Sequence, residues 1–306
     1  MNILLYCLTV LIWGTTWIAI NYQYGIVPVE LSIAYRFGLA SLVLFVVCLI
    51  AGKPLRFNRQ QHLRIAMLSC CIFGFNYFLL YSGQQHLNSA LVSIIFSTMV
   101  MMNIIHSRLF FGTPITLSTI WGAGIGSVGI VVLFWPTLVE THWGDNVAIA
   151  IVTCLCGTMV ASWGNMISIG NQLRGLPVLQ SNAWGMGYGS ILMLSVAIFN
   201  GRELVFDTST SYLVSLIYLA VFGSVIAFGA YFALLTRIGT AKASYASILF
   251  PGVAVVISTW VENFHWSLYT VSGFSLIMLG NIILVTQWPW LLAKFGWRRA
   301  TVQIES

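Results

Sequence analysis

The sequence predicts an all-α integral membrane protein, with ten transmembrane helices in two inverted five-helix repeats and both termini in the cytoplasm. Three observations lead to this fold class. The 306 residues are 59% hydrophobic and only 7% charged, whereas a soluble domain carries about 25% charged residues. Ten long apolar runs follow one another along the chain, and basic residues gather in alternate loops between them. This composition excludes a soluble enzyme, a nucleic-acid-binding protein and a disordered linker.

Each apolar run is long enough for a membrane helix, which needs about 20 mainly apolar residues. The runs cover roughly residues 3–21, 30–51, 64–84, 89–110, 117–135, 146–168, 179–199, 212–235, 243–262 and 268–288. We predict helices because a β-barrel strand would alternate apolar and polar residues over about ten positions. The first run lacks the basic leading segment and small-residue cleavage site of a signal peptide, so we interpret it as a retained helix.

Charged residues predict how these helices are oriented. Eleven of the 13 Lys and Arg residues fall on one side of the membrane, and cytoplasmic loops are enriched in such residues. They are Lys53, Arg56, Arg59, Arg64, Arg108, Arg174, Arg237, Lys242, Lys294, Arg298 and Arg299. The other side carries Glu30, Glu140, Asp145, Glu203 and Asp207, with Arg202 as its one basic residue. Both termini are therefore predicted to be cytoplasmic, in a multi-pass protein of the cell inner membrane.

The two halves of the chain match at several positions in the same order. The matches are Trp13-Gly14-Thr15 with Cys156-Gly157-Thr158, Ala34 with Ala183, Tyr77-Phe78 with Tyr231-Phe232, Ser93-Ile94 with Ser247-Ile248, and Gly122 with Gly273. They predict a five-helix repeat over residues 1–140, a second over 141–290, and a basic cytoplasmic tail over 291–306. Because each repeat has an odd number of helices, the two are inverted in the membrane. Inverted repeats are typical of alternating-access carriers, whose substrate site lies near the midplane.

Several segments also carry a family resemblance. They are Leu11-Ile12-Trp13-Gly14, Tyr35-Arg36-Phe37, Ser93-Ile94-Ile95-Phe96-Ser97, Ser247-Ile248-Leu249-Phe250-Pro251 and Glu262-Asn263-Phe264-His265-Trp266-Ser267. With them the chain resembles the drug/metabolite transporter (DMT) superfamily, EamA-type permeases. It departs from that family at Thr113-Pro114, where a Gly-Glu pair is common, and at Ser97-Thr98-Met99-Val100, where a proline is common. The resemblance implies a central cavity bordered by helices 1, 3, 4, 6, 8 and 9, with helices 5 and 10 outside it and available for dimer contacts. It further implies export of amino acids or other small metabolites, or import of choline-like compounds.

Polar and aromatic residues inside the runs are the candidates for substrate contact, because an unpaired polar group in lipid is unfavourable. The candidate substrate-binding residues are Trp13, Thr16, Trp17, Asn76, Tyr77, Tyr81, Ser97, Trp163, Asn165, Tyr231 and Tyr245. The third run has the clearest stripe, with Asn76, Tyr77, Tyr81, Gln84 and Gln85 on one broad helical face. The alternative is hydrogen bonding between helices, which we favour for any single Ser or Thr. For the stripe we favour a cavity.

Three ionisable residues each have two interpretations. Arg36, the one basic residue well inside a run, either clamps a substrate anion, or reaches the outer surface or pairs with an acid there, such as Glu262. The second is favoured, because the resemblance implies an arginine here whatever the substrate. His106, one turn from Asn103, either forms an inner gate or solvates a helix end. Glu262 either couples transport to protons or is a solvated surface carboxylate.

Together these features predict a secondary transporter that moves a small neutral or zwitterionic, amino-acid-like metabolite by alternating access, with export as the direction. One buried cation is too few for a phosphorylated sugar or a nucleotide. No catalytic residue, cofactor or metal is expected, and the six cysteines lie within runs without zinc-site spacing. The expected partners are the small-molecule substrate and the lipid bilayer, with no nucleic acid, and the protein is expected to be a monomer or homodimer. The alternatives are an accessory or scaffold protein, or a membrane enzyme without a recognisable active site.

Overall fold

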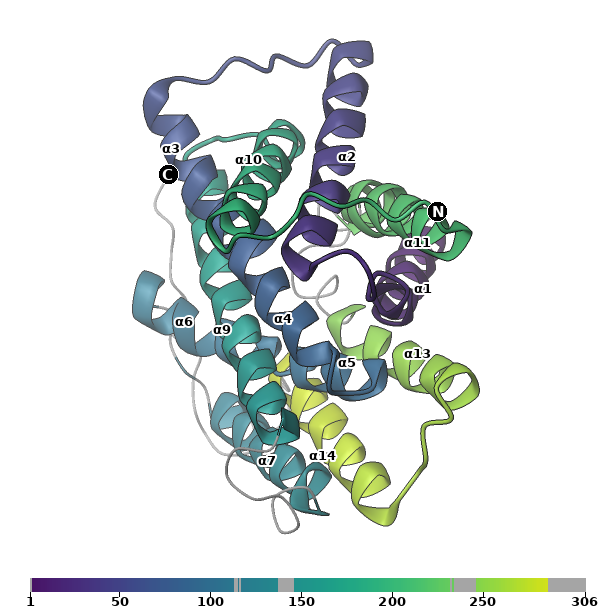
Figure 1. The fold of residues 1–306 in the computed structure, drawn as a ribbon. Helices are drawn as coiled ribbons and strands as arrows, with labels where there is room; N and C mark the ends of the chain where they lie inside the picture. The colour runs from purple at the N-terminus through teal and green to yellow at the C-terminus, as the bar shows by residue number, and fades with distance from the viewer. Residues whose placement is uncertain are drawn as a thin grey trace, which may run out of the picture.

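The computed structural model describes residues 2–112, 115, 117–136, 146–231, 233 and 246–285. Within these ranges the regular secondary structure is helical and contains no strand. The helices pack into one elongated bundle (Figure 1). A helix satisfies its own backbone hydrogen bonds, which a chain in lipid requires because the bilayer core holds no water to do so.

The helices follow the predicted runs. The first half contains α1 (Asn2–Asn21), α2 (Val29–Ile50), α3 (Arg59–Ser69), η1 (Cys70–Phe75), α4 (Asn76–Gln84), α5 (Ser89–Ser97), α6 (Met99–Phe111) and α7 (Leu117–Leu133). The second half contains α9 (Asn146–Leu173), α10 (Val178–Phe199), α11 (Thr210–Ile217), η2 (Tyr218–Ile226), α13 (Ala246–Val261) and α14 (Leu268–Val285). The segments η1 and η2 are π-helical, a geometry that is rare and occurs mostly as a short insertion within an α-helix.

Among the described residues, seven continuous helices are long and apolar enough to cross a membrane. They are Asn2–Asn21, Val29–Ile50, Arg59–Gln84, Ser89–Phe111, Asn146–Leu173, Val178–Phe199 and Thr210–Tyr231. Shorter apolar helices cover Leu117–Leu133, Leu249–Val261 and Leu268–Ile283, where the fifth, ninth and tenth runs were expected. The chain is therefore a multi-pass membrane protein, and a crossing by all ten helices stays a prediction.

Two helix ends differ from the expected ones, each for a local reason. The third helix begins at Arg59, five residues before the expected start, because Asn58 and Gln61 form a capping box. Asn58 Oδ1 accepts from Gln61 N and Gln61 Oε1 accepts from Asn58 N, both at 2.9 Å. The sixth helix continues to Leu173 and stops before Gly175, whose φ of 75° is the left-handed conformation typical of a helix C-terminus.

Helices α2 and α10 meet through small residues in a reciprocal contact. Ser41 Oγ in α2 donates to Ala183 O in α10, and Ser190 Oγ in α10 donates to Ala34 O in α2, both at 2.7 Å. The separation in sequence between Ala34 and Ala183 equals that between Ser41 and Ser190. Each helix therefore offers the other the same surface.

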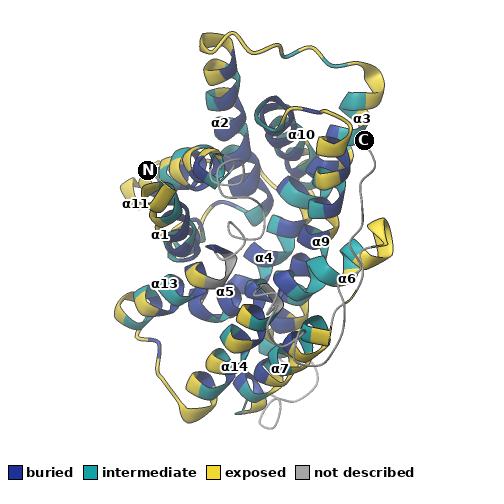
Figure 2. Cartoon of the chain, turned by 180° about the vertical axis from the view of Figure 1, so that it is seen from behind, coloured by how far each residue is buried: buried dark blue, intermediate teal, exposed yellow. Residues whose placement is uncertain are grey.

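Helices α7 and α14 lie side by side (Figures 1 and 2) and meet in the same reciprocal way. A Cβ placed on Gly280 would lie 2.6 Å from Gly122 O, and a Cβ placed on Gly129 would lie 2.9 Å from Gly273 O. The glycines therefore allow the two backbones to approach closely, which membrane helices use in place of a hydrophobic driving force.

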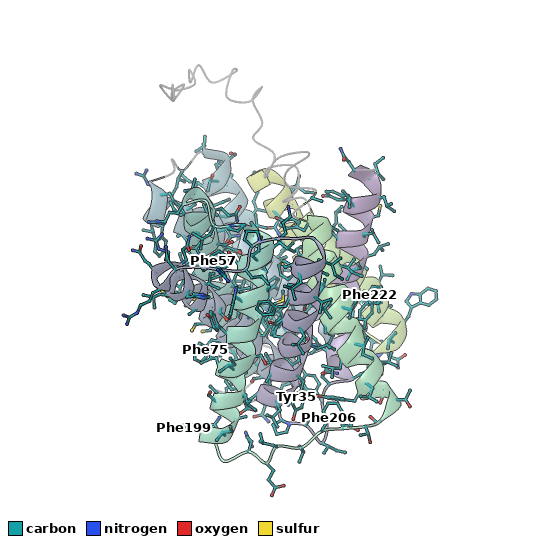
Figure 3. The ribbon with its side chains drawn as sticks, turned by 90° about the horizontal axis from the view of Figure 1, so that it is seen from above. Tyr35, Phe57, Phe75, Phe199, Phe206 and Phe222 are labelled. Carbon is teal, nitrogen blue, oxygen red and sulfur yellow. The ribbon has the colours of Figure 1, made fainter. Side chains whose placement is uncertain are left out.

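Buried residues line the inside of the bundle and exposed residues its outside (Figure 2). Many of the exposed residues are large and apolar, whereas several of the buried ones are polar. Phe199 is 90% exposed, Trp260 84% and Ile50 83%. Such side chains suit contact with lipid chains. Figure 3 shows Tyr35 and Phe206 together at one end of the bundle, and Phe75 and Phe222 on its flanks. Tyr35 Oη donates to Val205 O at 3.0 Å, which holds the α10–α11 connection against α2.

Candidate substrate-binding site

Arg36 is the most unusual side chain of the interior. It is 2% exposed in the second turn of α2. Its Nη1 donates to Tyr81 Oη at 3.0 Å and its Nε donates to Ser224 Oγ at 3.4 Å. The guanidinium carbon lies 4.7 Å from the ring centroid of Tyr77 and 5.2 Å from that of Phe37. Arg36 thus stays in the interior, between two ring faces, a phenol and a hydroxyl.

None of the described carboxylates contacts this guanidinium. Glu30, two turns before Arg36, accepts from Asn200 Nδ2 at 3.2 Å and lies 3.5 Å from Arg202 Nε. Glu262 has other partners, described below. The structure therefore does not place Arg36 at the outer surface or beside Glu262, the arrangement that the sequence favoured. Sequence alone suggests such a pairing because nothing local shows which distant helix will face Arg36.

The rings that contact Arg36 belong to a larger group of aromatic residues, which extends into the second half of the chain. We call Trp13, Phe37, Phe73, Tyr77, Tyr81, Phe228 and Tyr231 the aromatic cluster. Trp13 lies 5.3 Å from Phe228 and 5.1 Å from Tyr231 between ring centroids. Phe73 connects the two sides of the cluster, at 6.3 Å from Phe228 and 5.3 Å from Phe37. The cluster unites four of the predicted site residues, namely Trp13, Tyr77, Tyr81 and Tyr231.

The π-helical segment η2 supplies the backbone beside this cluster. Trp13 Nε1 donates to Gly223 O at 3.3 Å. A Cβ on Gly223 would lie 2.8 Å from Thr16 Cγ2 and 3.5 Å from Arg36 Nη2. Only glycine therefore lets this turn come so close to Thr16 and Arg36. Thr16 Oγ1 itself donates to Trp13 O in its own helix at 2.6 Å.

Three other predicted residues have more local roles. Trp17 is buried against Phe96 and Phe250, with ring centroids 5.3 and 6.3 Å away. Ser97 Oγ donates to Ile94 O in its own helix at 2.7 Å, and not to another helix as we favoured for single serines. Asn76 is 3% exposed, and its Oδ1 has no hydrogen-bond partner among the described residues.

Glu262 lies at the centre of a second group, which we call the carboxylate cluster: Asn21, Gln84, Ser89, Ser258 and Glu262. The carboxylate accepts from Ser89 N at 3.2 Å, from Ser89 Oγ at 2.6 Å, from Asn21 Nδ2 and from Ser258 Oγ. Gln84 Nε2 donates to Asn21 Oδ1 at 2.8 Å. The cluster joins α1, α4, α5 and α13, and its carboxylate caps the N-terminus of α5.

His106 lies in a third group, which we call the histidine cluster: Asn103, His106, Ser162, Trp163 and Asn165. Ser162 Oγ donates to Asn103 Oδ1 at 2.7 Å, so at the 2.8 Å contact with Ser162 the His106 Nδ1 is the donor. Trp163 Nε1 donates to His106 Nε2 at 3.0 Å. These partners assign His106 as the neutral Nδ1–H tautomer.

The structure thus separates residues that the sequence grouped into one site. Trp163 and Asn165 belong with His106 on the α6–α9 contact, and Asn165 Nδ2 donates to Asn103 Oδ1 at 3.3 Å. The prediction for Tyr245 lies outside the described residues, as does that for Thr113-Pro114. Sequence analysis missed Ser89, Gly223 and Ser224, because their roles depend on helices more than 150 residues away. Among the described residues no group of His, Cys, Asp and Glu could hold a metal ion.

Comparison with known proteins agrees with this architecture. A model of the EamA-like transporter family matches residues 1–135 and 148–286. Protein PagO of Salmonella typhimurium is 25% identical over 92% of this chain and 90% of its own length. The uncharacterized inner membrane transporter YedA of Escherichia coli K12 is 26% identical over 89% of this chain and 85% of its own. A crystal structure with 16% identity covers 96% of this chain and 98% of its own at a TM-score of 0.69, which shows a shared fold. Because the family model covers nearly the whole sequence, this chain belongs to the EamA-like transporter family of the DMT superfamily and is a membrane transporter.

Proposed function

We propose that the protein is a secondary carrier that exports a small neutral or zwitterionic, amino-acid-like metabolite across the inner membrane by alternating access. The aromatic cluster around Arg36 carries the proposal, because it combines ring faces, phenols and one cation deep within membrane-spanning helices. Rings bind apolar and cationic groups, while hydroxyl and guanidinium groups bind polar ones. Likeness to YedA, named an inner membrane transporter, supports the location. Export as the direction rests on the family resemblance.

We also propose that residues 1–140 and 141–290 are the two inverted repeats of this carrier. The reciprocal contacts of α2 with α10, and of α7 with α14, support this division. A contact in which each partner offers the same surface is the kind that a two-fold axis produces. In inverted-repeat carriers such an axis lies in the membrane plane, and exchanging the conformations of the two halves moves the access path from one side to the other.

The carboxylate and histidine clusters are proposed as the two gates. Asn21 and Glu262 join the first helix to the ninth, and Ser162 and His106 join the sixth to the fourth. The first helix corresponds to the sixth in the other repeat, and the fourth corresponds to the ninth. The two proposed gates therefore join equivalent pairs of helices. Ser89 lies at the start of the fourth span and His106 lies near its end. From the rise of an α-helix, the two positions are about 25 Å apart. Protonation of Glu262 would remove a hydrogen-bond acceptor from the first gate, which would couple opening to protons. The groups that bind this carboxylate are all neutral.

Uptake by proteoliposomes tests the transport proposal. The purified full-length chain is reconstituted and given labelled amino acids, nucleosides, glucose or choline, with and without a pH gradient. We expect uptake of zwitterionic amino acids, and an apparent affinity at least about tenfold weaker in Tyr77→Ala, which removes a ring from the cluster. Phe75→Ala is the matched control, because Phe75 is an exposed aromatic residue of the same span. Absence of uptake for every class, or equal loss in both variants, would contradict the proposal.

A further inference from the structure

We propose that Arg36 is a binding site for one anionic group, so that the transported metabolite must carry a carboxylate or a similar monoanion. This inference rests on the proposed transport function and narrows its substrate class. The anionic end would meet the guanidinium, and the aromatic cluster would hold the rest of the molecule. Neutral sugars, nucleosides and simple amines would then not be substrates.

The first argument is that the charge of Arg36 is buried without compensation. Sequence alone places no Asp or Glu in residues 1–29, 31–139 or 208–261. The elements that contact Arg36, which are α2, α4 and η2, therefore offer a single acid, Glu30. Glu30 is held by Arg202 and Asn200. A buried cation without a counter-charge is strongly unfavourable, so an arriving anion would be stabilised beside Arg36.

The second argument is the geometry of the guanidinium. Its Nη1 donates to Tyr81 Oη and its Nε to Ser224 Oγ, and both of these partners are neutral hydroxyls rather than carboxylates. The guanidinium carbon lies over the rings of Tyr77 and Phe37, and neither ring supplies a counter-charge. An arginine edge is the standard partner for a carboxylate, through short charge-assisted hydrogen bonds.

The third argument concerns the number of charges. Among the described residues, Arg36 is the one cation within the aromatic cluster, so it balances one negative charge and no more. A phosphate ester with two charges would remain half unpaired. An amino acid can place its carboxylate on Arg36 and its ammonium group against a ring face or an amide oxygen. A simple monocarboxylate would satisfy the same cation.

Thermal melting of the purified full-length chain tests the anion site without knowledge of the natural substrate. The probes are pairs that differ only in charge: sodium benzoate with benzamide, and L-phenylalanine with L-phenylalaninamide. A ligand that binds only the folded state raises Tm, by an amount that increases with the ratio of its concentration to Kd. We expect stabilisation by the carboxylate of each pair, and an apparent affinity at least about 30-fold weaker in Arg36→Gln. Arg202→Gln is the control, because it removes an arginine that already has a carboxylate partner.

A second variant separates binding from folding. Arg36→Met replaces the uncompensated cation with an apolar chain, so without ligand we expect a Tm equal to or above that of the wild type. A Tm well below the wild type would show that Arg36 is a structural residue. Equal stabilisation by a carboxylate and its amide, no stabilisation by either carboxylate, or a full response in Arg36→Gln would also overturn the proposal.

The outcomes distinguish this inference from the transport function. Undiminished proteoliposome uptake of a neutral solute in Arg36→Gln would support the transport function and refute the anion site. Stabilisation by benzoate that is lost in Arg36→Gln, together with no uptake of any solute, would support the anion site and refute the transport function.

Discussion

Polar side chains inside this membrane protein divide by whether their neighbours satisfy all of their hydrogen-bonding groups. Ser97 and Thr158 donate to carbonyls of their own helices, so their hydroxyl hydrogens already have partners. Asn76 Oδ1 and Gln84 Oε1, in contrast, are buried acceptors without a described partner. Because an unpaired buried acceptor is unfavourable, a water or a substrate donor would be stabilised at these two amide oxygens, as it would at Gln23 Oε1.

At the same scale, Glu262 is predicted to contribute to stability as a helix cap. Glu262→Ala removes the acceptor for Ser89 N and Ser89 Oγ at the start of α5. We expect the free energy of unfolding to fall by about 1–2 kcal/mol, as for other lost N-terminal caps. The comparison is Glu203→Ala, which changes an exposed acid of the α10–α11 connection. Fluorescence-monitored melting in detergent measures both, and an equal Tm for the two variants would refute the capping role.

At the scale of elements, glycines allow neighbouring helices to pack closely. A Cβ on Gly273 of α14 would lie 2.5 Å from Leu133 N of α7, whereas a Cβ on Gly124 of α7 would have no atom within 4 Å. The two glycines look alike in the sequence. Only the packing shows that one is required and the other is replaceable.

This difference predicts opposite effects for two equal substitutions. Gly273→Ala forces the two helices apart and should lower the free energy of unfolding by about 1–3 kcal/mol, as overpacking does. Gly124→Ala adds a methyl group in open space and should be neutral or stabilise by up to about 1 kcal/mol through helix propensity. Melting curves in one detergent compare them. A destabilised Gly124→Ala, or an unaffected Gly273→Ala, would contradict the packing described here.

At the scale of the whole molecule, the charge asymmetry predicts which end of the bundle faces the cytoplasm. Glu203 lies in the connection between α10 and α11, and Arg59 starts α3. In a chain with its native cysteines replaced by serine, a membrane-impermeant maleimide should label Glu203→Cys in intact bacteria. Arg59→Cys should be labelled only after the membrane is permeabilised. The reverse pattern would show that the orientation is opposite to the predicted one. Labelling of both variants in intact cells would contradict the charge-based prediction of orientation.

Much of the fold could be predicted because its determinants are local. Apolar runs of about 20 residues specify membrane helices whatever surrounds them. The expected runs at 30–51 and 179–199 accordingly agree with α2 and α10 to within one residue. The start of α3 was predicted five residues late, because the capping box of Asn58 and Gln61 extends a helix into polar sequence that hydropathy does not mark.

The site could be predicted only in part, because its determinants are distant in sequence. The sequence by itself determined the membrane class, the helical segments and the aromatic and polar residues available to a site, since these follow from composition and local hydropathy. The tertiary structure decided which of them meet. Arg36 lies against Ser224, 188 residues away, and Trp163 against His106, 57 residues away. Helix packing placed these partners side by side, and it depends on the shapes of all the contacting surfaces together. The sequence of one helix alone therefore does not specify which helix packs against it.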